Sequence, residues 1–216
     1  MNILLVRPDG IGDEILCLPV ATALRQLKPQ ARVIFLSSQY AAPVLEHHQD
    51  VDDIWTLSGC ESLRDLVRLF QRGVDAAIFL KPFRRLMLAA WLARVPIRVA
   101  TGYRWYSVLA NRRIYEHRSD FSKHETAYNV GMLKGLGLNP PAPVPPKLVI
   151  TEEERQAAVD ARSEVGDQRF EWEEKDIFCI PSWTRFRHGA SSEAVLFSFN
   201  DFPAMRALAL YREETL

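Results

Sequence analysis

The sequence predicts an α/β fold in which a parallel β-sheet is covered by helices on both faces. Short continuous apolar runs alternate with amphipathic segments through the first 140 residues. Continuous apolar runs are typical of strands covered on both faces, whereas the segments between them have the period of helices. Short loops join the two kinds of segment, which favours repeated β-α units and therefore a parallel sheet.

The expected strands and helices alternate regularly up to the end of this region. Strands are expected at 3–6, 32–36, 53–57, 75–80 and 98–100. Helices are expected at 14–27, 40–47, 61–72, 84–93 and 123–136. The first helix carries Leu16, Val20 and Leu24 at helical spacing and ends before Pro29. The last one is closed by Gly135 and Gly137.

A proline-rich segment divides the chain into two predicted domains. Five of the eight residues from 139 to 146 are proline, which excludes a helix or a central strand and favours an extended linker. We therefore expect a Rossmann-like domain at 1–146 and an incomplete second domain at 147–216. Thr151 and Glu154 have capping-box spacing, which predicts a helix over 152–164. After Gly166 the β-α rhythm is lost.

Composition excludes several classes of function. The 27 Lys and Arg residues balance the 27 Asp and Glu residues, which argues against a broad nucleic-acid surface. Cys17, Cys60 and Cys179 have no C-x-x-C spacing, which argues against a disulfide framework or a zinc site. The adjacent His47 and His48 rarely converge on one ion, so no metal is expected. No apolar run reaches the roughly 18–20 residues that span a bilayer, and no signal peptide is evident, which favours a cytoplasmic protein.

The most informative segment is RPDGIGD at 7–13, which joins the first strand to the first helix. In an open α/β sheet this turn lies at the carboxyl ends of the strands, where ligands bind. Gly10 and Gly12 allow a close backbone approach to a ligand, and the helix start beyond them favours an anion. Asp13 could take a proton from a substrate hydroxyl there, or it could simply cap the helix. Only G-x-G is present, so a dinucleotide fingerprint is poorly supported.

Basic residues follow the later strands of the predicted sheet. Arg84 follows the fourth strand, Arg104 follows the fifth, and Lys123 and His124 begin the last helix. Each is by itself typical of a solvated surface. Because all of them lie where strands pass into helices, together they indicate an anion-binding cleft.

Several motifs taken together resemble glycosyltransferase family 9, the ADP-heptose:lipopolysaccharide heptosyltransferases and their relatives. The segment 7–13 is followed by Leu18-Pro19 and an Ala-Leu-Arg helix, as in the start of that family. Further matches are DAAI at 75–78, VATGYR at 99–104 and KHETAYN at 123–129. The resemblance covers about residues 1–150.

The resemblance implies a GT-B fold, in which an N-terminal Rossmann-like domain binds the acceptor and a C-terminal domain binds the nucleotide-sugar. It implies transfer of a heptose or related sugar to the lipid A–core oligosaccharide, with inversion and without metal or cofactor. Asp13 would be the general base. Asp9, Gly10, Ile11 and Gly12 would form the substrate turn, while Arg84, Arg104, Lys123 and His124 would contact the acceptor. The lipid acceptor implies peripheral contact with the inner face of the cytoplasmic membrane.

The C-terminal part departs from the family. Phe178 to Pro181 reach the first strand expected of a donor domain, but residues 182–188 replace its glycine turn and a Thr-Gly-x-x-His motif is absent. The sequence therefore predicts a truncated donor domain over 147–216, frameshifted after about Glu171. Two alternatives remain: a catalytically silent fragment that lacks the donor domain, and an unrelated nucleotide-binding α/β domain.

Overall fold

The structure is a computed structural model that describes residues 1–116, 123–149, 151, 162–165, 168–171 and 186–189. The chain divides into two compact units, Met1–Val149 and Ile150–Leu216. Each unit is described by itself below.

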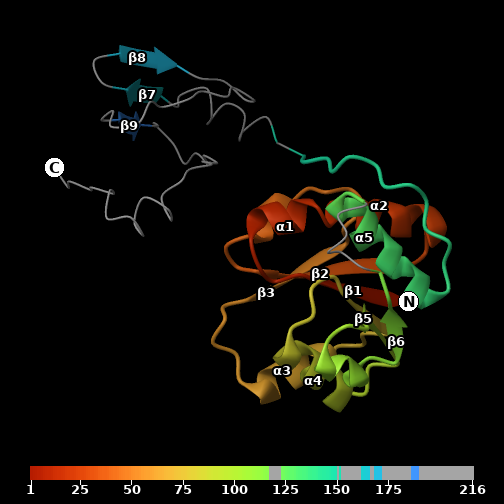
Figure 1. The fold of residues 1–216 in the computed structure, drawn as a ribbon. Helices are drawn as coiled ribbons and strands as arrows, with labels where there is room; N and C mark the ends of the chain where they lie inside the picture. The colour runs from red at the N-terminus through yellow and green to blue at the C-terminus, as the bar shows by residue number, and fades with distance from the viewer. Residues whose placement is uncertain (117–122, 150, 152–161, 166–167, 172–185, 190–216) are drawn as a thin grey trace. The chain divides into compact units, whose positions relative to one another are not determined.

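The first unit is a six-stranded parallel sheet between two layers of helices (Figure 1). The strands are β1 (Asn2–Val6), β2 (Arg32–Ser38), β3 (Asp53–Leu57), β4 (Ala76–Phe79), β5 (Ile97–Thr101) and β6 (Arg112–Ile114). Their spatial order is β3-β2-β1-β4-β5-β6, and each neighbouring pair is parallel. The predicted fold class is confirmed for this unit.

The helices of this unit are short. They are α1 (Ile11–Ile15), α2 (Leu18–Leu27), α3 (Leu63–Phe70), α4 (Arg84–Leu92) and α5 (Glu125–Gly131). The described residues of this unit also form three 3₁₀ helices, η1 (Ala42–Leu45), η2 (Trp105–Leu109) and η4 (Met132–Leu136).

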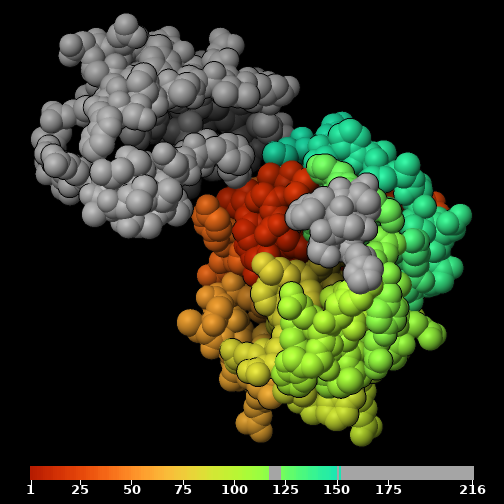
Figure 2. All heavy atoms as spheres, viewed as in Figure 1, coloured from red at the N-terminus to blue at the C-terminus, as the bar shows by residue number. Residues whose placement is uncertain are grey.

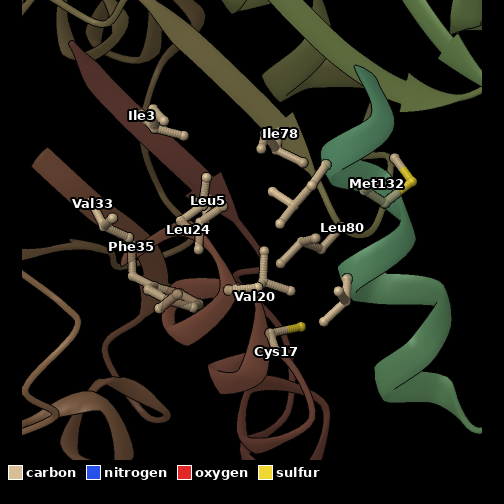
Figure 3. Packing of buried hydrophobic residues seen from close by; sticks show 14 of the residues in the cluster. Ile3, Leu5, Cys17, Val20, Leu24, Val33, Phe35, Ile78, Leu80 and Met132 are labelled. Carbon is tan, nitrogen blue, oxygen red and sulfur yellow. The ribbon is translucent and has the colours of Figure 1, made fainter. Parts of the chain in front are cut away.

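Two hydrophobic cores lie on opposite faces of the sheet, because successive strand residues point to opposite sides. Ile3 and Leu5 belong to the core beneath α2 and α5, together with Phe35 and Ile78 (Figure 3). Leu4 and its alternate neighbours belong to the core beneath α3 and α4. Both faces are therefore dry, which explains why the strands appear in the sequence as unbroken apolar runs.

The predicted helix over 14–27 differs from the observed structure. The helix begins earlier, at Ile11, and the chain breaks between α1 and α2 at Leu16 and Cys17. Pro19 explains the break: its ring lacks an N–H and would clash with the carbonyl of Ile15 in a continuous helix. The break turns α1 into a separate short element at the sheet edge.

Other predicted elements are shorter or were missed. Residues 40–47 form only η1, since His47 adopts a left-handed conformation with φ 61°. The helix predicted over 123–136 begins at Glu125 and passes into η4, which ends at Gly137 with φ 73°. Strand β6 was not predicted, because its three residues include two arginines and give no apolar run.

The second unit contains strands β7 (Arg162–Val165), β8 (Gln168–Glu171) and β9 (Phe186–Gly189). They form an antiparallel sheet in the order β8-β7-β9. Most of the helix predicted over 152–164 lies outside the described residues, and its last three residues belong to β7. The strand expected at 178–181 also lies outside them.

Within the described residues, no helix is both long enough and apolar enough to cross a membrane.

Candidate functional site at the carboxyl edge of the sheet

The turn after β1 lies where three strands end side by side. Val6 is paired with Leu36 of β2 and with Phe79 of β4. The backbone N–H of Arg7 donates to Leu36 O, and that of Leu80 donates to Val6 O, at 3.1 and 3.2 Å. The parallel register thus brings the segments after β1, β2 and β4 together at one edge.

Arg7 is the centre of a cluster of charges at this edge. It is 4% exposed, and its Nε donates to Asp9 Oδ1 at 2.8 Å. Its Nη2 lies 2.6 Å from Asp13 Oδ1, and its Nη1 lies 3.9 Å from Glu125 Oε1. Lys81 completes the cluster, because its Nζ donates to Asp9 Oδ2 at 2.6 Å. The buried Arg7 guanidinium therefore joins the turn after β1 to α5, and Asp9 joins the turn to the segment after β4.

Asp13 is held by this cluster and does not cap a helix. The N-cap of α1 is Gly10, and no side chain caps that helix. The side chain of Asp13 is 43% exposed, and only its Oδ1 faces Arg7. Among the described residues, no hydrogen bond is made to its other oxygen. A half-exposed carboxylate with one oriented and one open oxygen has the geometry that a general base requires.

The glycines of the turn leave room beside the backbone. A Cβ atom added at Gly10 or Gly12 would meet no atom within 4 Å. Gly10 has φ −84°, so it does not need the freedom of glycine for its conformation. Ile11 between them is buried and anchors the turn. Neither backbone geometry nor packing among the described residues explains these two glycines, whereas an approaching ligand would.

A buried acid, Glu14, links the turn to strand β2. Glu14 is fully buried, and Ser37 Oγ donates to its Oε2 at 2.9 Å. Its Oε1 has no hydrogen-bond partner among the described residues. Burial raises the pKa of Glu14 to about 7. Ser38 Oγ donates to Asp9 O at 3.0 Å, so β2 holds the turn at two points.

Helix α5 holds the far end of α1. Asn129 is fully buried, and its Nδ2 donates to Leu16 O at 3.1 Å, at the break between α1 and α2. Cys17 lies beside it, and burial raises the pKa of the Cys17 thiol, as befits an inert packing residue.

The four predicted basic positions are arranged differently from one another. Arg84 starts α4 and Arg104 precedes η2; both are exposed, and neither pairs with a carboxylate among the described residues. Lys123 lies 3.5 Å from Glu116, and His124 caps α5 by accepting from the N–H of Thr126. No hydrogen bond or ion pair in the described part of the chain joins any of these four to Asp13.

Three members of the charge cluster were not predicted as site residues. Arg7 was placed in the turn without a role, Lys81 belonged to a basic segment expected to face the cleft, and Glu125 was part of a motif only. The spacing R-x-D-x-x-x-D at 7–13 carried a signal, because an arginine that precedes two acids in one turn can pair with both. The contact to Glu125, more than a hundred residues away, had no signal in the sequence.

The described residues contain no group of three or more His, Cys, Asp or Glu side chains placed to hold a metal ion. The charge cluster contains both cations and carboxylates, and each carboxylate is already oriented by a cation. Its members are Arg7, Asp9, Asp13, Lys81 and Glu125. What it can do chemically is position a hydroxyl or an anionic group near Asp13.

The first unit is similar to solved glycosyltransferase structures. The glycosyl transferase family 9 structure from Veillonella parvula DSM 2008 matches 73% of this chain with a TM-score of 0.63 and 20% identity. E. coli heptosyltransferase WaaC with ADP-2-deoxy-2-fluoro heptose matches 67% with a TM-score of 0.55 and 15% identity. The chain spans about half the length of each, 47% and 51%.

Curated relatives of two different kinds match the sequence. A putative glycosyltransferase of Haemophilus influenzae is 26% identical over 137 residues, which are 62% of this chain and 40% of that protein. Gentisate 1,2 dioxygenase 1 of Aquipseudomonas alcaligenes is 46% identical over 52 residues, 24% of this chain and 15% of that protein. The 5-aminosalicylate 1,2-dioxygenase of a Comamonas species is 39% identical over 51 residues, or 23% and 14%. No family model matches the chain.

The parallel α/β fold of the first unit is of the kind seen in solved glycosyltransferase structures. The chain resembles the family 9 heptosyltransferases, as the sequence motifs predicted.

Proposed function

We propose that this chain carries the acceptor-binding half of a heptosyltransferase-like glycosyltransferase, with Asp13 as the general base. The observation that carries the proposal is Asp13 itself: a half-exposed carboxylate at the carboxyl edge, with one oxygen oriented by Arg7 and open space beside Gly10 and Gly12. The fold shared with family 9 structures supports the same assignment.

The proposed reaction is a single displacement at the anomeric carbon of a nucleotide-sugar such as ADP-heptose. The acceptor oxygen forms a bond to that carbon while the bond to the nucleotide phosphate breaks, which inverts the centre. The hydroxyl proton passes to the open oxygen of Asp13, and the nucleotide leaves with the electron pair of the broken bond. In this proposal no metal takes part, so cationic side chains would have to stabilise the negative charge that develops on the departing diphosphate.

Other residues of the edge would bind and position the acceptor. Asp9, Gly10, Ile11 and Gly12 form the wall against which the reacting sugar would lie. Arg7 Nη1 is buried without a hydrogen bond among the described residues, so an acceptor oxygen could complete it. The exposed Arg84 and Arg104 pair with no carboxylate among the described residues, and their guanidinium groups are suited to phosphates. Lys123 and His124 already have partners, so their proposed role in acceptor binding is the weaker one.

The proposed acceptor is the lipid A–core oligosaccharide. Because that molecule is anchored in a bilayer, we propose that the protein acts at the inner face of the cytoplasmic membrane, as a peripheral protein.

The test is Asp13→Asn in the full chain, assayed as ADP release from ADP-heptose with a lipid A–core acceptor. We expect a loss of about 10²- to 10⁴-fold in turnover, because the amide cannot accept the proton. Acceptor binding, measured by calorimetry, should change little.

Two variants control this experiment. Asp13→Glu keeps the carboxylate and should restore part of the turnover. Asp53→Asn removes a carboxylate that pairs with Arg32 at 2.8 Å at the opposite edge of the sheet, and it should leave turnover unchanged. If the unaltered chain turns over and Asp13→Asn turns over equally fast, Asp13 is excluded as the base. No turnover by the unaltered chain would contradict the transferase and support the silent module described next.

A second candidate function is favoured by the dioxygenase match: a catalytically silent module that binds acceptor only. The glycosyltransferase-like similarity accounts for 137 residues in sequence, and the unit with that fold is Met1–Val149. We infer that the 52 dioxygenase-like residues lie in Ile150–Leu216. A frameshifted donor domain would not be expected to reach 46% identity with another protein, so this match favours a segment of separate origin. The antiparallel order of β7, β8 and β9 is also unlike a parallel donor domain.

Titration of the full chain with ADP-heptose separates the two candidates. Saturable heat with ADP-heptose supports the transferase. Heat with the acceptor but none with ADP-heptose supports the silent module. Sequencing of the gene region tests the origin of the second unit: another frame that restores a glycine turn and Thr-Gly-x-x-His would contradict a separate origin.

A further inference from the structure

We propose that the face around η2 is a docking surface for an anionic phospholipid membrane. The surface consists of the exposed side chains of Tyr103, Trp105, Val108 and Tyr115, and is called the aromatic surface below. It lies beyond the carboxyl end of β5, and the segment that contains it is on the outside of the first unit (Figure 2). The inference stands on these side chains and not on the proposed transfer reaction.

The geometry of η2 explains why apolar side chains project outward here. A 3₁₀ helix has three residues per turn, so residues i and i+3 lie on the same side. Trp105 and Val108 have this spacing and are 74% and 68% exposed. The other side of η2 faces inward, where Tyr106 Oη donates to Pro82 O at 3.0 Å and Ser107 is buried.

The backbone around η2 is held firmly. Ser107 Oγ donates to Thr101 O at 2.6 Å, and Arg113 Nε donates to Ser107 O at 3.0 Å. The Tyr103 and Tyr115 rings pack edge to face, with centroids 5.6 Å apart. A Cβ atom at Gly102 would collide with the Tyr115 ring, so this glycine makes the ring packing possible. The exposed rings are thus presented by a rigid base rather than a loose loop.

The charge of this region is strongly one-sided. Residues 76–115 contain no Asp or Glu, although the whole chain has zero net charge. The same forty residues contain eight cationic side chains: Lys81, Arg84, Arg85, Arg94, Arg98, Arg104, Arg112 and Arg113. Not all of them lie at the aromatic surface, since Arg94 and Arg98 lie beside Trp91 and Leu92, and Lys81 pairs with Asp9. Arg104, Arg112 and Arg113 are exposed and lie in or beside η2 and β6. A cationic rim is complementary to anionic headgroups, and each such side chain contributes about 1 kcal/mol near an anionic leaflet.

The mixture of residues favours a lipid surface over a nucleic acid. Trp and Tyr rings concentrate at the membrane interface, because one end is apolar and the other carries a polar group. Val108 has no π-face on which a base could stack, but it can enter the acyl boundary. If the proposed acceptor is correct, the same contact would bring a bilayer-anchored molecule to the sheet edge that carries Asp13.

The experiment is co-sedimentation of the full chain with phosphatidylcholine vesicles that contain or lack phosphatidylglycerol. We expect binding to the anionic vesicles only, weakened by added salt. Trp105→Ala combined with Val108→Ala should lower the partition constant at least about tenfold, since both side chains would leave the lipid phase. Arg104→Gln should lower it about fivefold.

A matched control lies at the opposite edge of the sheet. Trp91 and Leu92 are 49% and 42% exposed just before β5 begins, beside Arg94. Trp91→Ala combined with Leu92→Ala should leave vesicle binding unchanged. An equal loss in this control, or equal binding to both kinds of vesicle, would overturn the proposal. So would binding of a single-stranded oligonucleotide in place of vesicles, or a dimer that dissociates on Trp105→Ala.

Discussion

The turn after β1 and the contact between β5 and η4 both depend on glycine, but for opposite reasons. At Gly10 and Gly12 a methyl group would meet nothing within 4 Å. At Gly135 a Cβ would collide with the side chain of Val99, which is fully buried. There is therefore open space beside the two glycines of the turn, whereas no space for a side chain remains between Gly135 and Val99.

Charge follows the same division between the two regions. Around the turn lie a buried guanidinium, three carboxylates and a buried acid, one of whose oxygens has no hydrogen-bond partner among the described residues. The β5–η4 contact is apolar and lies in the core that Figure 3 illustrates. Tight apolar packing, as at the β5–η4 contact, stabilises a fold, whereas buried charges and unused space, as at the turn, lower its stability. Such costs are typical of functional sites, so the turn is the region that indicates function.

The largest expected effect is on the pH dependence of stability, through Glu14. Its pKa in the folded chain is about 7, against an ordinary value of 4.5. Folding therefore favours the protonated acid, and the stability it contributes is fully present below pH 4.5 and is lost as the pH rises through 7. Relative to Glu14→Gln, the unaltered chain should lose about 3 kcal/mol of unfolding free energy across this range.

Urea unfolding followed by the helical circular dichroism signal measures this difference, because the described helices lie in the first unit. Glu46→Gln, at an exposed carboxylate, is the control and should give a flat difference across pH. A flat difference for Glu14→Gln as well would mean that Glu14 is ionised in the folded chain.

The second largest effect is expected on stability at Gly135, the glycine that has no space beside it. Gly135→Ala should lower the unfolding free energy by about 1–3 kcal/mol, because Val99 must shift inside a packed core. The same urea titration measures it. Unchanged stability would show that η4 can move away from β5 without cost.

The smallest effect on stability is expected at Gly12, the glycine that has open space beside it. Gly12→Ala should leave the unfolding free energy unchanged or raise it by up to about 1 kcal/mol, since alanine favours the helix and meets no neighbour. Acceptor binding should nevertheless weaken, because the methyl group would occupy the space beside Asp13. If stability falls and binding is retained, the contrast between the two glycines is wrong.

The strand pattern was predictable because it depends on local periodicity. Continuous apolar runs such as Ile3 to Val6 identified five of the six strands, and the β-α alternation identified the parallel sheet. The prediction failed where a single residue overrides periodicity, as at Pro19, which divides the first helix. It also failed after η1, where Glu46 is extended and His47 is left-handed, so the helix predicted to run to residue 47 does not continue. It also failed at β6, whose arginines lie at a sheet edge and need no apolar run.

The candidate site was predictable only in part. The sequence by itself placed Asp13 at the carboxyl end of the first strand, because that position follows from the order of elements along the chain. Only the tertiary structure decided that Arg7, Lys81 and Glu125 surround it, since parallel register and helix packing bring together residues that are distant in the chain. Local periodicity determines which elements form; the burial of a charge, and therefore its partners, is settled only when those elements pack.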